Sequence, residues 1–154
     1  TALDLIYEHR SAELQIAGRL DIDTTGLLLI TDDGKWNHRL TSPRSNCQKI
    51  YRVTLGIPIT PDYREKLANG VWLEGEKHPC LPATMEVIDD QTVMLSIAEG
   101  KYHQVKRMFA ALGNHVEALH RTQVGGIILD ESLEPGDYRA LTEAEVASIM
   151  AATT

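Results

Sequence analysis

Residues 18–31 read GRLDIDTTGLLLIT, a polar loop that runs directly into an apolar segment. The apolar part, residues 26–31, has the length of a β-strand, and its unbroken hydrophobicity predicts a strand buried on both faces. The loop before it places two carboxylates, Asp21 and Asp23, beside buried structure, where catalytic side chains often lie. The same acids and the threonines that follow them are equally compatible with a plain Asx-turn network.

Outward from this stretch, short helices and strands alternate along the chain. Helices are predicted at residues 3–9, 35–40, 60–70 (with Thr60 as the N-cap), 103–112, and after a capping box formed by Thr142 and Glu145. Strands are predicted at residues 14–17, 26–31, 48–55, 82–88, 92–98, 115–121 and 126–129. This order predicts an α+β domain in which a mainly antiparallel, mixed β-sheet is flanked by short helices.

The composition is typical of a globular domain. The chain has 154 residues, enough to bury a core, and 43% of them are hydrophobic and 24% charged. Its longest apolar run is far shorter than the ~20 residues of a membrane helix, and charges interrupt residues 4–10, where a signal peptide would be apolar. Cys47 and Cys80 show no metal-ligand or disulfide-framework spacing. We therefore expect a single cytoplasmic domain that is monomeric, binds no metal and contacts no membrane.

Positive charge is concentrated in two parts of an otherwise acidic chain. The formal net charge is -7, which on its own argues against a nucleic-acid partner. Residues 35–52 and 100–121, however, hold nine of the 15 basic side chains and one of the 22 acidic ones. If these windows fold onto one face, that face is a phosphate-binding surface. Otherwise they only decorate two solvated elements.

Four segments together carry a family resemblance. They are Arg19-Leu20-Asp21 with Thr24 and Gly26-Leu27; Lys49-Ile50-Tyr51; residues 99–108 (EGKYHQVKRM); and Leu119-His120-Arg121 with Val124-Gly125. In this order they resemble the RsuA/RluA branch of the pseudouridine synthases, and the resemblance spans residues 18 to 125. The third segment, with Gly113-Asn114-His115, is most similar to the RsuA-type members, which act on small-subunit ribosomal RNA.

The resemblance implies roles for particular side chains. Asp21 matches the catalytic carboxylate, which leaves Asp23 as a bystander. Tyr51 matches an aromatic residue that packs on the target base, and Lys106 matches a basic residue that pairs with the carboxylate. The side chains expected to bind substrate are Leu119 at the uracil pocket, the phosphate-binding candidates Arg39, Arg44, Lys49, Arg52, Lys101 and Arg107, and also Arg19 and His103.

The implied reaction converts one uridine of 16S ribosomal RNA to pseudouridine. Uracil is detached from its ribose, rotated and rejoined through carbon, which involves no redox change and implies neither a cofactor nor a metal. An ionised carboxylate suits the positive charge that builds at the sugar, and Asp21 could attack the anomeric carbon or take a neighbouring sugar proton. The base must first leave the RNA stack, and stacking on Tyr51 would offset ~1–3 kcal/mol of that cost.

Other interpretations remain open from the residues alone. A synthase for 23S ribosomal RNA would share these motifs, a non-catalytic RNA-binding module would not need Asp21, and a carboxylate-based hydrolase would normally need a second acid. Two family features have no counterpart: an S4-like RNA-binding module, and the Lys-Pro-containing strand that opens the catalytic domain. We therefore expect residues 1–154 to be a catalytic domain shortened at its N-terminus.

Overall fold

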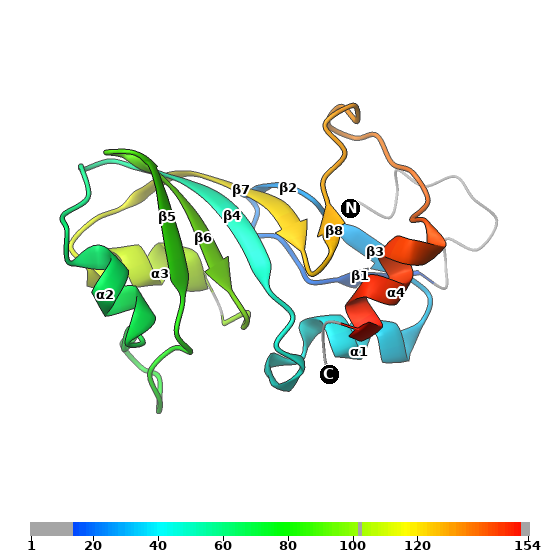
Figure 1. Ribbon diagram of the computed structural model, residues 1–154, viewed down its shortest axis with the longest axis horizontal. Helices are drawn as coiled ribbons and strands as arrows, with labels where there is room; N and C mark the ends of the chain where they lie inside the picture. Colours follow the sequence, from blue (N-terminus) through cyan, green and yellow to red (C-terminus); the bar gives the residue numbers. More distant parts are fainter. Residues whose placement is uncertain (1–13, 102, 152–154) are drawn as a thin grey trace.

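The computed structural model describes residues 14–101 and 103–151, which form two lobes side by side (Figure 1). The strands are β1 (Gln15–Ala17), β2 (Thr25–Gly26), β3 (Leu29–Thr31), β4 (Lys49–Leu55), β5 (Thr84–Asp89), β6 (Thr92–Ile97), β7 (Val116–Val124) and β8 (Ile127–Ile128). The helices are α1 (Gly34–Thr41), α2 (Tyr63–Ala68), α3 (Gln104–Ala111) and α4 (Glu143–Ala151), with a 3-10 turn at Pro43–Ser45. The helix predicted at residues 3–9 lies outside the described residues.

The main sheet joins strands that are far apart in sequence. Six of the described strands form it. Five of them follow the order β2-β7-β4-β6-β5, and the sixth, β8, pairs with β7. The pairing of β2 with β7 is parallel, whereas the other ladders are antiparallel. The expected α+β fold with a mainly antiparallel, mixed sheet is thus confirmed.

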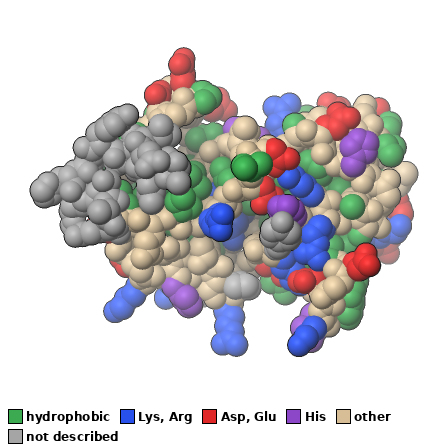
Figure 2. Space-filling model, turned by 180° about the vertical axis from the view of Figure 1, so that it is seen from behind, with side chains coloured by type: hydrophobic (Ala, Val, Ile, Leu, Met, Phe, Trp, Pro, Cys, Tyr) green, Lys and Arg blue, Asp and Glu red, His purple; other side chains and the backbone are tan. Residues whose placement is uncertain are grey.

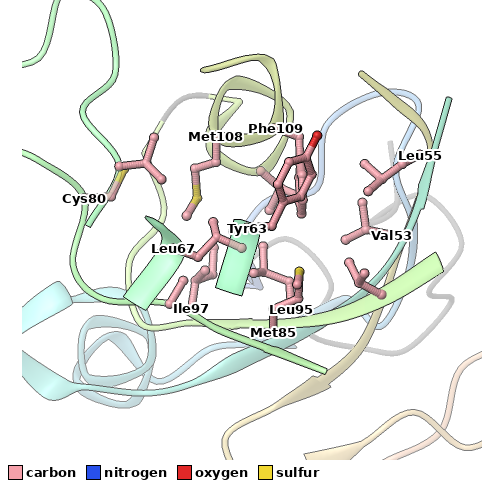
Figure 3. Packing of buried hydrophobic residues seen from close by; sticks show 14 of the residues in the cluster. Val53, Leu55, Tyr63, Leu67, Cys80, Met85, Leu95, Ile97, Met108 and Phe109 are labelled. Carbon is pink, nitrogen blue, oxygen red and sulfur yellow. The ribbon is translucent and has the colours of Figure 1, made fainter. Parts of the chain in front are cut away.

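The large lobe consists of β4 to β7 with α2 and α3 packed on one face of the sheet (Figures 1 and 3). On β4 the alternating residues Val53 and Leu55 are fully buried, as strand periodicity requires. Helix α3 contributes Met108 and Phe109, and the Phe109 ring packs against Tyr63 of α2 with a centroid separation of 6.3 Å. Burial of each large apolar side chain contributes roughly 1.5–3 kcal/mol, so this lobe has an extensive core of its own.

The small lobe consists of the β1–β3 pair, α1 and α4. Asp33 caps α1 by accepting hydrogen bonds from the backbone N–H groups of Lys35 and Trp36 at 3.0 and 3.1 Å. Trp36 and Leu40, one helical turn apart, are buried, and the indole N–H of Trp36 donates to Val146 O of α4 at 3.0 Å. The predicted capping box of α4 is confirmed, since Thr142 and Glu145 exchange backbone-to-side-chain hydrogen bonds at 2.9 and 3.1 Å.

The prediction of one continuous strand over residues 26–31 is wrong. The segment divides into β2, which joins the main sheet, and β3, which pairs with β1. Burial alternates from Leu27 to Ile30, so only one face of β3 is buried. The division occurs because Arg121 of β7 binds Leu27 on both its backbone N–H and its carbonyl, after which the chain leaves the sheet.

Two boundaries also differ from the predictions. Helix α2 begins at Tyr63 rather than after Thr60, because the Thr60 hydroxyl donates to the Asp62 carboxylate instead of capping a helix. Strand β7 continues to Val124, three residues beyond the predicted end. None of the described helices is long and apolar enough to cross a bilayer.

Candidate active site

The loop that carries Asp21 is fixed at its C-terminal end by β2. Thr24 N donates to Asp21 O at 2.9 Å and closes a turn, and Thr25 then pairs with His120 in the parallel ladder. The Thr25 hydroxyl lies 2.7 Å from Nδ1 of His120. Gly26 has a φ of 115°, and a Cβ atom there would overlap the backbone of Arg121. A glycine is therefore required where this loop meets β7.

Arg121 holds both ends of the same loop. Its side chain is 1% exposed; Nε donates to Leu27 O at 2.8 Å and Nη2 donates to Gly18 O at 2.7 Å. The rigid fork of a guanidinium suits two acceptors that diverge in this way. Sequence reasoning did not assign a role to this residue, although strand alternation from the pocket candidate Leu119 places Arg121 on the same buried face.

A cavity of about 640 Å³ lies beside this loop and brings together residues from all four motif segments. Five substrate-binding candidates line it together with Asp21 and Tyr51: Arg19, Lys49, Lys101, His103 and Leu119. The wall is completed by Ile16, Gly18, Leu20, Ile22, Thr24, Thr41, Ile97, Glu99, Gly100, Gln104, Val105 and Arg121. The small lobe and the loop form one side, and the sheet and the start of α3 form the other.

Two candidate side chains, Lys106 and His103, approach the Asp21 carboxylate. Its Oδ2 lies 3.9 Å from Nζ of Lys106, and its Oδ1 lies 3.8 Å from Nε2 of His103. The Asp21 side chain is 31% exposed, so it is in contact with both solvent and the cavity. His103 has a left-handed backbone with a φ of 48°, a conformation that is uncommon for a residue other than glycine and that occurs often at functional sites.

Asp23 is the closer partner of Lys106. The ammonium of Lys106 donates a hydrogen bond to Oδ1 of Asp23, and this bond holds the pKa of the Asp23 carboxyl below its ordinary value. Lys106 thus contacts both acids of the loop, and Asp23 is the nearer of the two. Lys106 itself is not part of the cavity wall.

Tyr51 and Leu119 lie on the sheet side of the cavity. Tyr51 is half-buried and sits across from Leu95 on one neighbouring strand and Arg121 on the other. Leu119 is 7% exposed and faces the cavity from β7. An aromatic ring and an aliphatic side chain on a rigid sheet form a surface that can receive a planar base.

Three buried polar residues stand deeper in the same wall. Glu99 accepts hydrogen bonds on Oε1 from Leu81 N at 2.7 Å and from Nε2 of Gln104 at 2.9 Å, and Gln104 in turn accepts from Lys101 N at 2.9 Å. Lys49 is 4% exposed, so it lies inside the cavity wall rather than on the outer surface where a phosphate-binding lysine was expected.

The other basic candidates lie outside the cavity wall. Arg39 donates to Met150 O of α4 at 3.4 Å, and Arg107 donates to Glu74 O at 2.9 Å. Arg44 and Arg52 are exposed. On the face shown in Figure 2, basic side chains gather near the middle with acidic ones among them. The two basic windows thus meet at the cavity through Lys49, Lys101 and Arg121, but not all of their charges lie on one surface.

The described residues contain no cluster of three or more His, Cys, Asp or Glu side chains able to hold a metal ion. The cysteines Cys47 and Cys80 are free and buried, and burial raises the pKa of both thiols. The cavity combines the Asp21 carboxylate and the His103 imidazole with an aromatic ring, and Lys106 approaches the carboxylate from outside the wall. Such an arrangement suits reaction at a sugar carbon next to a bound base.

This chain belongs to the RNA pseudouridylate synthase family, whose model matches residues 1–111. It is 62% identical over 149 residues to the ribosomal small subunit pseudouridine synthase A of Vibrio cholerae, and 57% identical over 150 residues to the protein of that name in Escherichia coli. Each match covers 97% of this chain but only 64% and 65% of those relatives. The chain therefore spans just under two thirds of their length.

Solved structures agree with this assignment. A crystal structure of a pseudouridylate synthase superimposes with a TM-score of 0.94 at 52% identity, over 97% of this chain and 65% of the other. The archaeal box H/ACA Nop10-Cbf5 complex contains a chain that matches with a TM-score of 0.51 at 19% identity, over 86% of this chain and 43% of the other. The second likeness concerns the fold alone.

Proposed function

We propose that this chain is the catalytic part of an isomerase that converts a specific uridine of 16S ribosomal RNA to pseudouridine. The observation that carries the proposal is the cavity in which Asp21, Tyr51 and Leu119, brought from three separate segments, face one space. The high identity of the chain to ribosomal small subunit pseudouridine synthases supports 16S ribosomal RNA as the substrate.

In this mechanism the target uridine is extruded from the RNA and enters the cavity. Its base stacks on Tyr51 and contacts Leu119, and the ribose lies next to Asp21. The carboxylate either bonds to C1′ or takes a proton from C2′, and in both cases the bond from C1′ to N1 of the base breaks. Lys106 and His103 lie within 4 Å of the carboxylate and orient it toward the sugar.

RNA binding in this proposal relies on the basic residues around the cavity mouth. Arg19, Lys101 and His103 line the cavity, and the exposed Arg44 and Arg52 add phosphate contacts outside it. Arg39 and Arg107 lie outside the cavity wall and each donates to a backbone carbonyl, so any phosphate contact that they make is remote from the target uridine. The substrate is the ribosomal RNA or an assembly intermediate, and the protein acts as a monomer in the cytoplasm.

The test is site mapping with one matched variant. The chain and its Asp21→Asn form are incubated with unmodified 16S and 23S ribosomal RNA, and pseudouridine is mapped by carbodiimide labelling and primer extension. We expect one stop on 16S RNA with the wild type and none with Asp21→Asn, while both proteins bind RNA equally well. A stop on 23S RNA alone would refute the choice of RNA. Tight binding without any stop would favour a non-catalytic RNA-binding module, and free uracil would indicate a hydrolase.

A further inference from the structure

Lys49 places a charged group inside the cavity, next to the proposed base platform. Its side chain is 4% exposed and faces the same space as Asp21 and Tyr51. Lys49 and Tyr51 are two positions apart on β4, so their side chains leave the same face of the sheet about 6–7 Å apart. Ile97 of β6, which lies directly across from Lys49, also lines the cavity.

The ammonium of Lys49 has no hydrogen-bond or ion-pair partner in the part of the chain that the structure describes. Glu99 attracts it only from a distance, without a direct ion pair, and the Oε1 atom of that carboxylate accepts hydrogen bonds from Leu81 N and Gln104. Burial lowers the pKa of Lys49, and the positive charge of Arg121 lowers it further, whereas Cys47 and Glu99 act in the opposite direction. The Lys49 side chain is buried, but its Nζ is not among the fully enclosed polar atoms without a partner, so the ammonium opens onto the cavity. A largely buried lysine with no partner among the described residues costs stability, which indicates that this position serves a ligand.

The reaction proposed above creates an anion at this place, and the present inference rests on that proposal. When the C1′–N1 bond breaks, its electron pair leaves with the base. Whether Asp21 forms an ester at C1′ or is protonated by C2′, the carboxylate loses its negative charge and the detached uracil gains it. On the ester route, C5 bonds to C1′ as the bond from C1′ to the Asp21 oxygen breaks; on the elimination route, C5 bonds to C1′ as Asp21 returns its proton to C2′. Either way the carboxylate regains its charge, after which C5 loses its proton to a base and N1 takes one up.

We propose that the Lys49 ammonium is a further catalytic group that stabilises the negative charge on the detached uracil. A preorganised cation in a water-poor cavity is effective at this because the charge appears only once the bond breaks. Lys106 stands at the other end of the charge transfer, beside Asp21. The Lys49 neighbours Tyr51 and Ile97 are suited to a planar base rather than to a strongly hydrated phosphate.

The experiment compares Lys49→Met and Lys49→Arg with Lys66→Met, which makes the same change on an exposed residue of α2. Single-turnover rates at saturating 16S RNA, RNA dissociation constants and urea midpoints are measured for each. We expect Lys49→Met to lower the rate about 10²-fold, Lys49→Arg to recover part of it, and Lys66→Met to match the wild type. RNA affinity should stay unchanged. The urea midpoint of Lys49→Met should be equal to or above that of the wild type, because an unpaired buried charge has been removed.

Binding of free bases tests the anion site without turnover. The probes are uracil, which is neutral at pH 7, and 5-nitrouracil, which is an anion at that pH. We expect the wild type to prefer the anion and Lys49→Met to lose this preference. The inference is overturned if Lys49→Met weakens RNA binding with an unchanged rate, which would make Lys49 a phosphate contact, or if it only lowers the urea midpoint. If the wild type turns over no RNA, the proposed function fails, and the base preference alone then decides whether Lys49 forms an anion site.

Discussion

The two lobes provide opposite sides of the cavity but are built very differently. Among the described residues, the core of the large lobe contains sixteen buried hydrophobic side chains, whereas the core that the small lobe shares with the end of β7 and with β8 contains nine. The large lobe presents Tyr51, Lys49 and Leu119 from long, fully paired strands, whereas Asp21 stands on a loop that leads out of the two-stranded part. The carboxylate thus depends on the less extensively packed side, and its position relative to the base platform depends on what ties the lobes together.

Arg121 is that tie, and its removal should have the largest effect. Arg121→Met leaves the carbonyls of Leu27 and Gly18 without their donors, and each unsatisfied buried acceptor costs about 1–3 kcal/mol, so we expect a loss of ~2–6 kcal/mol in urea unfolding. Turnover should fall as well, since the Asp21 loop loses both anchors. Arg64→Met is the control, because Arg64 also donates to a carbonyl but from an exposed position. Equal stability of the two variants would contradict the role of Arg121 as a tie.

Matched truncations of buried leucines should sharpen the difference between the lobes. Leu95→Ala in the large lobe and Leu29→Ala in the small lobe each remove a leucine that is at most 3% exposed, and such changes cost ~2–5 kcal/mol. We expect the loss of stability in Leu95→Ala to lie near the upper end of this range and the loss in Leu29→Ala near its lower end. Turnover is measured at a temperature where both variants are folded. Here we expect the larger loss in Leu29→Ala, because β3 follows the Asp21 loop. The same order in both assays would show that the site does not depend on the small lobe in particular.

The Lys106 contacts offer a smaller and more local change. Lys106→Met removes a positive charge 3.9 Å from Asp21, and we expect turnover to fall about tenfold, or ~1.4 kcal/mol in the activation barrier. Asp23→Asn should change turnover less, because Lys106 keeps its place near Asp21. A rate unchanged by Lys106→Met would remove the lysine from the site.

Asp23→Asn has a separate signature in the pH dependence of stability. Lys106 holds the pKa of Asp23 below its ordinary value, so the pair stabilises the fold above that ordinary value and loses its contribution as the pH falls through the lower, folded value. Urea midpoints of the wild type and of Asp23→Asn should therefore converge at the acid end.

The smallest effect is expected at the start of α4, far from the cavity. Thr142→Ala removes the side-chain half of the capping box and should cost about 1 kcal/mol in urea unfolding. Turnover at a temperature where the protein is folded should be unchanged, because α4 contacts α1 and β8 and contributes no residue to the cavity wall. A loss of turnover without a loss of stability would show that the small lobe transmits changes at its periphery to Asp21.

Local sequence patterns predicted the elements that local interactions determine. The helix predicted at residues 103–112 corresponds to α3, and the strands predicted at 82–88 and 92–98 correspond to the adjacent, antiparallel β5 and β6. The motif resemblance also identified Asp21, Tyr51 and Leu119 as site candidates, and the fold places all three around one cavity.

Features set by contacts between distant residues were not predictable in the same way. The division of residues 26–31 into two strands follows from the bonds of Arg121 to Leu27, which join positions 94 residues apart. The burial of Lys49 was likewise missed, because only the pairing of β4 between β6 and β7 places that lysine in the interior. No window of neighbouring residues contains this information.

The parallel pairing of β2 with β7 has a consequence for when the protein acquires its site. Residues 25 and 26 find their partners only at residues 120 and 121, near the end of the sequence. A nascent chain therefore cannot complete the cavity until β7 has emerged from the ribosome that is synthesising it. Contacts over so long a sequence separation also form slowly. The site is thus assembled only after β7 has been synthesised, and a chain interrupted before β7 lacks the partner strand that fixes the Asp21 loop through β2.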